Sequence, residues 1–161
     1  MIDLHLLESD DKKSGDKEKD PPPSPFCQGF SKDSLEALYS TAYSYYQNGL
    51  YDDSIRIFRL LATMDPYEKK YWVGLGASCQ QHKEYKNALK AYSSAAMIDF
   101  DDPAPHLHAA ECYLSLENVE EALKALTIAE KCSLNSPCVN PKLVERIALM
   151  KNIWQTTKKE S

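Results

Sequence analysis

The sequence predicts an all-α fold made of stacked helix pairs, and three observations support this prediction. Apolar residues recur at helical spacing from Ser31 onward, and no stretch keeps the apolar–polar alternation of a strand. The same pattern also returns after 34 and after 68 residues. Four aligned positions keep small residues with small ones and large with large, and a fifth stays apolar: Ala42, Gly76 and Ala110; Tyr51, Tyr85 and Val119; Ser54, Ala88 and Ala122; Phe58, Tyr92 and Leu126; and, as the fifth, Leu61, Ala95 and Ala129.

A helix-turn-helix period of 34 residues is that of the tetratricopeptide repeat. Three repeats are expected, at about 35–68, 69–102 and 103–136, stacked as a right-handed helical solenoid within a domain at 31–157. The segment 141–157 is predicted to be a C-terminal capping helix that covers the exposed face of the last repeat. The middle copy carries the template residues of the repeat at Trp72, Leu75, Gly76, Tyr85, Ala88, Tyr92 and Ala95.

Capping signals predict where the helices begin. Asp33 stands three residues before Glu36, and Asp65 stands three residues before Glu68, the spacing at which the first side chain caps a helix and the second reaches back. Prolines occupy positions suited to a first helical residue at Pro66, Pro103 and Pro141. Helices are therefore expected to start near residues 34, 66, 103 and 141. Polar or glycine-containing gaps at 47–51, 82–85 and 116–119 separate the two helices of each pair.

Residues 1–30 are predicted to form a mostly disordered, acidic and proline-rich arm. They contain the run ESDDKKSGDKEKD and the cluster PPPSP, with seven acids against four lysines. So little apolar surface cannot offset the entropy lost on ordering the chain. This arm carries most of the net charge of −5.

The composition narrows the function classes. The chain has 161 residues, of which 43% are hydrophobic and 27% charged, as in soluble globular proteins. A negative net charge without a basic patch argues against a nucleic-acid partner. No run approaches the ~18 apolar residues of a membrane span, so no membrane insertion is expected. The N-terminus has an acid where a signal peptide has basic residues, and the expected location is the cytoplasm.

The first helix of each predicted pair carries two stripes at helical spacing. The first stripe follows the template core: Leu38, Ala42 and Tyr45; Trp72, Gly76 and Cys79; His106, Ala110 and Tyr113. The second stripe lies one residue further along, and is therefore rotated by ~100°: Tyr39, Tyr43 and Tyr46; Val73, Ala77 and Gln80; Leu107, Glu111 and Leu114. Because first helices line the concave side of such a stack, the second stripe predicts a groove that binds the apolar chain of a partner.

The tyrosines of this second stripe suit binding, because they supply contact area at little entropic cost and still tolerate water through their hydroxyl groups. An alternative stays open, in which the N-terminal arm or a flanking helix covers the tyrosines, so that they belong to the hydrophobic core of the chain itself. Glu111 also has two interpretations. It either receives a backbone amide or a lysine of the partner, or it points to solvent.

Other candidate sites in the sequence are weak. His108 and Cys112 stand four residues apart with His106 nearby, but two ligands fall short of the four of a structural zinc site. Cys79 and His82 allow a thiol-nucleophile interpretation, yet Cys79 occupies a core position. No metal, no cofactor and no catalytic residue is therefore expected.

The sequence resembles the class II chaperones of bacterial type III secretion, the SycD/LcrH group that includes IpgC, PcrH and SicA. The resemblance covers about residues 33–150. It is carried by the segments 35–67 and 71–99, and especially by HAAECYLSLENVEEAL at 108–123. It implies a cytoplasmic bacterial chaperone without enzymatic activity that keeps hydrophobic translocator proteins soluble and secretion-competent.

The resemblance also implies how the partner binds. The groove of this family takes an extended N-proximal segment of the translocator through spaced apolar anchors, and Tyr39, Tyr43 and Tyr46 match its aromatic positions. Relatives commonly form homodimers through a helix ahead of the first repeat, where this chain has its charged run and PPPSPF. A homodimer is accordingly a further expected partner, with its geometry left open.

A general scaffold or co-chaperone that docks the C-terminal peptide of a heat-shock protein is the alternative function. That use of the fold requires a clamp of lysine and asparagine side chains for carboxylates. Tyr39 and Tyr43 occupy the corresponding places in the first repeat, which disfavours this alternative.

Overall fold

The computed structural model describes residues 30–135 and 141–157, with side chains described as far as Trp154. These residues form helices only, which confirms the predicted all-α fold. The predicted disordered arm lies outside the described residues except for Phe30. The helices are α1 (Lys32–Gln47), α2 (Tyr51–Met64), α3 (Lys69–Gln81), α4 (Tyr85–Ile98), α5 (Pro103–Ser115), α6 (Val119–Asn135) and α7 (Pro141–Thr157).

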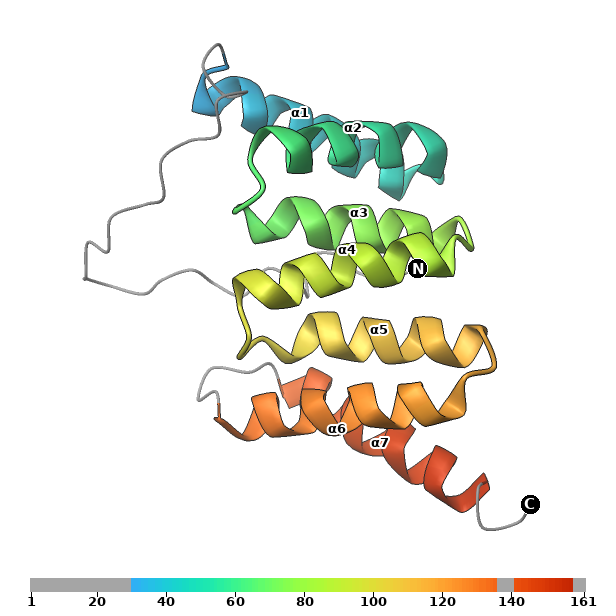
Figure 1. Ribbon diagram of the computed structural model, residues 1–161. Helices are drawn as coiled ribbons and strands as arrows, with labels where there is room; N and C mark the ends of the chain where they lie inside the picture. Colours follow the sequence, from blue (N-terminus) through green and yellow to red (C-terminus); the bar gives the residue numbers. More distant parts are fainter. Residues whose placement is uncertain (1–29, 136–140, 158–161) are drawn as a thin grey trace.

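The helices stack in chain order from the pair α1–α2 to the pair α5–α6, and α7 crosses the end of the stack obliquely (Figure 1). Each helix packs on the helix before it and the helix after it, and α1 also touches α3. Such an arrangement buries a continuous core between layers, because no single helix pair can cover its own apolar face.

The 34-residue period is visible in the backbone itself. The turn inside each pair contains one residue of positive φ, at Gly49 (76°), Lys83 (63°) and Glu117 (59°). In each turn the next amide reaches back five residues, as from Leu50 to the carbonyl of Tyr45 at 2.9 Å. Glycine adopts this left-handed conformation without steric cost, whereas Lys83 and Glu117 adopt it against one. The shared turn geometry sets the angle at which each second helix returns along the first.

Two of the predicted helix starts are right and two are displaced. Helices α5 and α7 begin at Pro103 and Pro141 as predicted. Helix α1 begins at Lys32, because Ser31 caps it by accepting from the amide of Ser34 at 3.1 Å.

The predicted start of the third helix at Pro66 is wrong by three residues. The Asp65 side chain does not cap a helix there; its Oδ1 accepts the amide of Tyr67 at 3.3 Å and closes a turn that contains Pro66. Glu68 then becomes the N-cap of α3, accepting from the amide of Lys70.

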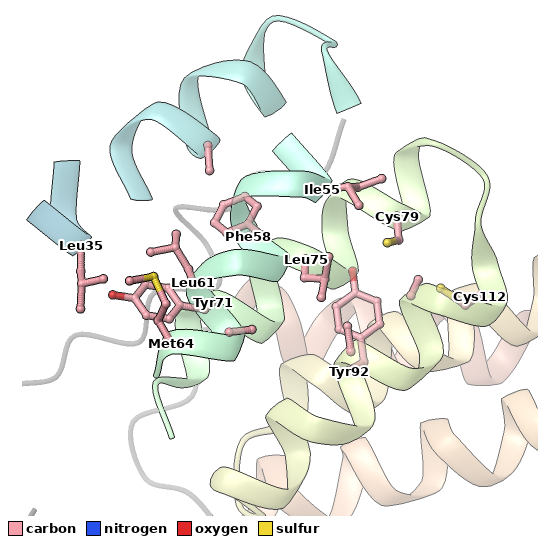
Figure 2. Close-up of a cluster of buried hydrophobic side chains, with 14 residues drawn as sticks. Leu35, Ile55, Phe58, Leu61, Met64, Tyr71, Leu75, Cys79, Tyr92 and Cys112 are labelled. Atoms are coloured by element: carbon pink, nitrogen blue, oxygen red, sulfur yellow. The ribbon is translucent and has the colours of Figure 1, made fainter. Parts of the chain in front are cut away.

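Glycines in α3 allow two aromatic rings to approach the helix backbone. A methyl group added at Gly76 would lie 2.6 Å from the ring of Tyr92, and one added at Gly74 would lie 2.4 Å from the ring of Phe58. Neither distance is possible for a real side chain. Figure 2 shows Phe58 and Tyr92 in the cluster of buried side chains to which α1, α2, α3, α4 and α5 contribute. Close approach is therefore the reason for the small residues that the repeat pattern selects.

Candidate functional site

The nine predicted groove residues separate by depth. Tyr39, Tyr43, Gln80, Glu111 and Leu114 are partly buried, whereas four others are fully buried: Tyr46, Val73, Ala77 and Leu107. Tyr46, Val73 and Ala77 share a cluster with Ala95 and Ala104. These four residues therefore act as packing within the stack, and contact with a partner is left to the five that keep exposed surface.

The aromatic end of the expected groove consists of Tyr39 and Tyr43 of α1, with the buried ring of Tyr71 of α3 packed against Tyr39. The rings of Tyr39 and Tyr43 stack with centroids 6.5 Å apart and an interplanar angle of 17°. Tyr39 also meets Phe58 edge-on at 5.8 Å and Tyr71 at 6.0 Å. Such ring pairs stabilise beyond the area that they bury, so these contacts favour the observed arrangement of the rings.

A lysine accompanies the aromatic end. Lys70 Nζ lies 4.7 Å from the centroid of the Tyr39 ring and 2.7 Å from Glu36 Oε2. The repeat pattern did not select Lys70 or Tyr71, because both stand just ahead of the template tryptophan at 72. Their signal in the sequence was the run KKYW at 69–72, in which an aromatic residue and cations precede that tryptophan.

A polar centre beside the expected groove consists of the partly exposed Gln80, Glu111 and Arg146 and the buried Tyr92 and His108. Tyr92 Oη donates to Gln80 Oε1 at 2.8 Å, and Gln80 Nε2 donates to Glu111 Oε2 at 3.0 Å. His108 Nδ1 lies 3.0 Å from the same oxygen. Arg146 Nη2 pairs with Glu111 Oε1 at 2.5 Å. One carboxylate thus connects α3, α5 and α7, and through Gln80 it reaches α4.

The Glu111 carboxylate is ionised in this setting. Burial acts to raise its pKa, but the hydrogen bond and charge of His108, the charge of Arg146 and the Gln80 amide more than offset that effect, so the pKa lies below its usual value. The interpretation of Glu111 as a solvent-facing side chain is wrong, since only 12% of it is exposed. Both of its oxygens already have partners, which makes it an organiser of Gln80 and Arg146. Contact between Glu111 and cargo stays a prediction.

Arg146 is a charged residue of this face that the repeat pattern did not select. It lies on α7, which was assigned only a capping role. The available signal was its position 35 residues after Glu111, close to one repeat length, on a helix that continues the stack.

The cysteine and histidine residues considered as nucleophiles or metal ligands have structural roles. Burial raises the pKa of the Cys79 thiol to about 11 and that of the Cys112 thiol to about 12, so both are protonated at neutral pH. His82 Nε2 faces Asp52 Oδ1 at 3.4 Å. Within residues 30–135 and 141–157, no three His, Cys, Asp or Glu side chains come together as metal ligands. No helix in the described part of the chain has the length and apolar character to cross a membrane.

Comparison with known proteins agrees with this geometry. Tetratricopeptide repeat family models match residues 35–68 and 80–131, which confirms the predicted repeat type. Low calcium response locus protein H of Yersinia pseudotuberculosis is 37% identical over 107 residues, 66% of this chain. The chain spans 64% of the length of that relative.

Two solved structures resemble nearly the whole stack. PcrH of Pseudomonas aeruginosa, solved in complex with the chaperone binding region of PopD, superposes with a TM-score of 0.76 at 35% identity, over 81% of this chain and 97% of that one. The type III secretion translocator chaperone SycD of Yersinia enterocolitica, in an alternative dimer, superposes with a TM-score of 0.75 at 34% identity, over 80% and 96%.

Proposed function

Because the chain belongs to the tetratricopeptide-repeat chaperones of type III secretion translocators, we propose that it binds a hydrophobic translocator protein and keeps it soluble and secretion-competent. The translocator would bind through an extended N-proximal segment laid along the concave face. We place this activity in the bacterial cytoplasm, before export, and assign the chain no catalytic reaction. A homodimer is proposed as a further assembly, since SycD forms one.

The observation that carries this proposal is the aromatic end. Tyr39 and Tyr43 keep part of their surface exposed while ring contacts with Phe58 and Tyr71 hold the Tyr39 ring. A preorganised apolar surface can receive an apolar anchor without losing side-chain entropy at that moment. The hydroxyl groups keep the same surface compatible with water between cargo molecules.

In the proposed mechanism, the chaperone protects apolar segments of the translocator by binding them. A translocator must enter a membrane later, so it carries apolar segments that would associate with one another in water. Seating the spaced anchors of one such segment on α1, α3 and α5 removes them from solvent. An extended segment also has unpaired backbone carbonyls, and the second N–H of the Gln80 side chain, which the bond to Glu111 does not use, can donate to one of them.

The double variant Tyr39→Ala with Tyr43→Ala is expected to weaken cargo binding by about thirtyfold or more, since truncating a central aromatic anchor costs about 2 kcal/mol or more. The measurement is fluorescence anisotropy with a labelled chaperone binding region of PopD as the probe. Circular dichroism at the same concentration reports whether the helices remain.

Tyr67→Ala is the matched control, because Tyr67 is an exposed tyrosine in the turn between α2 and α3. It should leave the Kd unchanged. Equal losses in the control and in the double variant would count against the aromatic end as the binding site. If the double variant loses its helicity, the tyrosines belong to the hydrophobic core of the chain itself. The Kd of the single variant Tyr43→Ala then shows whether this ring also binds cargo.

A further inference from the structure

Helix α7 carries an exposed row beside its buried one. Ile147 is buried against the cluster around Leu107, with Leu143 and Met150 packed at its edges. The neighbouring row holds Arg146, Leu149 and Ile153, which are spaced three and seven residues from Arg146 and so share one face. The Arg146 side chain is 49% exposed, Leu149 is 61% exposed, and Ile153 is half exposed. A helix that served only as a cap would not need this second apolar row.

The exposed row of α7 continues the concave face by one helix. Arg146 pairs with Glu111, which belongs to the second stripe of α5, and Glu111 in turn binds Gln80 of the second stripe of α3. The line of side chains that begins on α1 therefore ends on α7 and not on α5. Figure 1 shows α7 directly after the α5–α6 pair, at the end of the stack.

The chemistry of this end differs from that of the aromatic end. A guanidinium group has five N–H donors, and in the part of the chain that the structure describes Arg146 pairs with one atom, Glu111 Oε1. Its side chain is 49% exposed, so N–H donors that Glu111 does not use can be reached from solvent. Guanidinium groups bind carboxylates through paired, charge-assisted hydrogen bonds, and Leu149 offers apolar contact three residues further along the helix.

We propose that Arg146 and Leu149 form a further subsite of the concave face, which binds an acidic residue of the translocator segment together with an adjacent apolar residue. This inference rests on the proposed function and adds to it a charge preference and a fourth lining helix. The partner chemistry is an extended peptide in which a carboxylate stands beside the last apolar anchor.

The test is a selection of random peptides displayed on phage, made on the full chain and on its variants. The unmodified chain should enrich peptides that pair Asp or Glu with a neighbouring apolar residue. Arg146→Gln should lose the acidic preference and keep the other anchors, and Leu149→Ser should lose the neighbouring apolar preference. In an enriched synthetic peptide, exchanging the acid for its amide should raise the Kd about tenfold on the unmodified chain and less than twofold on Arg146→Gln.

Arg56→Gln and Leu60→Ser on α2 are the matched controls, an exposed arginine and an exposed leucine on one helix face, and neither should change the selected peptides. Leu149→Ser alters a largely exposed side chain, so it tests the subsite even if Arg146→Gln lowers the Tm. Apolar anchors selected without any acidic preference would overturn the subsite and leave the proposed function intact. A selection that enriches no apolar peptides would overturn both.

Discussion

A Gly76→Leu variant is expected to lose most of its folding stability. A single added methyl group at Gly76 would lie 2.6 Å from Tyr92 Cε1, and Tyr92 is fully buried, with its hydroxyl bonded to Gln80. Overpacking by a few methylene groups costs about 1–3 kcal/mol. A leucine adds a whole isobutyl group against a buried ring and also displaces the Tyr92 hydrogen bond. We therefore expect the loss in the free energy of unfolding to exceed this range and to approach the total stability of about 5–15 kcal/mol that domains have.

The measurement for Gly76→Leu is urea unfolding followed by circular dichroism. Ala37→Leu is the control, because Ala37 is exposed on α1 and the same side chain added there meets no buried ring. The control should unfold at nearly the urea concentration of the unmodified chain. An unchanged midpoint in Gly76→Leu would contradict the repeat register, which places a small residue against Tyr92.

Phe58→Ala is expected to lower the free energy of unfolding by about 3–5 kcal/mol, the range for deleting a buried phenylalanine. Phe58 is fully buried on α2. Its ring lies over Gly74 of α3 and touches Tyr39 of α1, so its removal leaves a cavity where three helices meet. Thermal unfolding of the variant and of the unmodified chain gives the difference in the free energy of unfolding. A difference of less than about 1 kcal/mol would contradict this packing.

The contact between Phe58 and Gly74 can be isolated by a double-mutant cycle. Gly74→Ala should destabilise through its clash with the ring, and Phe58→Leu through lost packing. The combined variant should be destabilised by less than the sum, because the smaller leucine makes room for the new methyl group. Strict additivity of the two effects would show that the residues do not press on each other.

Most of the fold could be predicted from the 34-residue period of the sequence. Five positions that recur after 34 residues with matching residue types were enough to predict paired helices, and the positive φ angles of Gly49, Lys83 and Glu117 have the same spacing. Local chemistry was sufficient because each layer repeats the same contacts. The prediction from local sequence failed at the start of α3. Asp65 can cap either a turn or a helix, and the residues around it do not decide between the two.

The depth of the groove residues could not be predicted in the same way. Helical spacing places Tyr39 and Tyr46 on one stripe, yet Tyr46 is buried in a cluster with Val73 and Ala77 of α3, while Tyr39 keeps exposed surface. Which neighbour covers a side chain depends on residues more than 25 positions away. The sequence placed Gln80 and Glu111 on the second stripe but did not predict their connection to Arg146 for the same reason, since Glu111 and Arg146 become partners only when α7 packs against the stack.

Site-specific photo-crosslinking can show directly whether cargo binds on the concave face. A photoreactive phenylalanine analogue is placed at Tyr43 or Leu114 on the first helices, or at Leu60 or Met97 on the second helices, where both side chains are exposed. Each chain is then irradiated with its co-expressed translocator. We expect crosslinks to the translocator from positions 43 and 114 and none from positions 60 and 97. Crosslinks from 60 and 97 alone would contradict this expectation and place the cargo on the outer face.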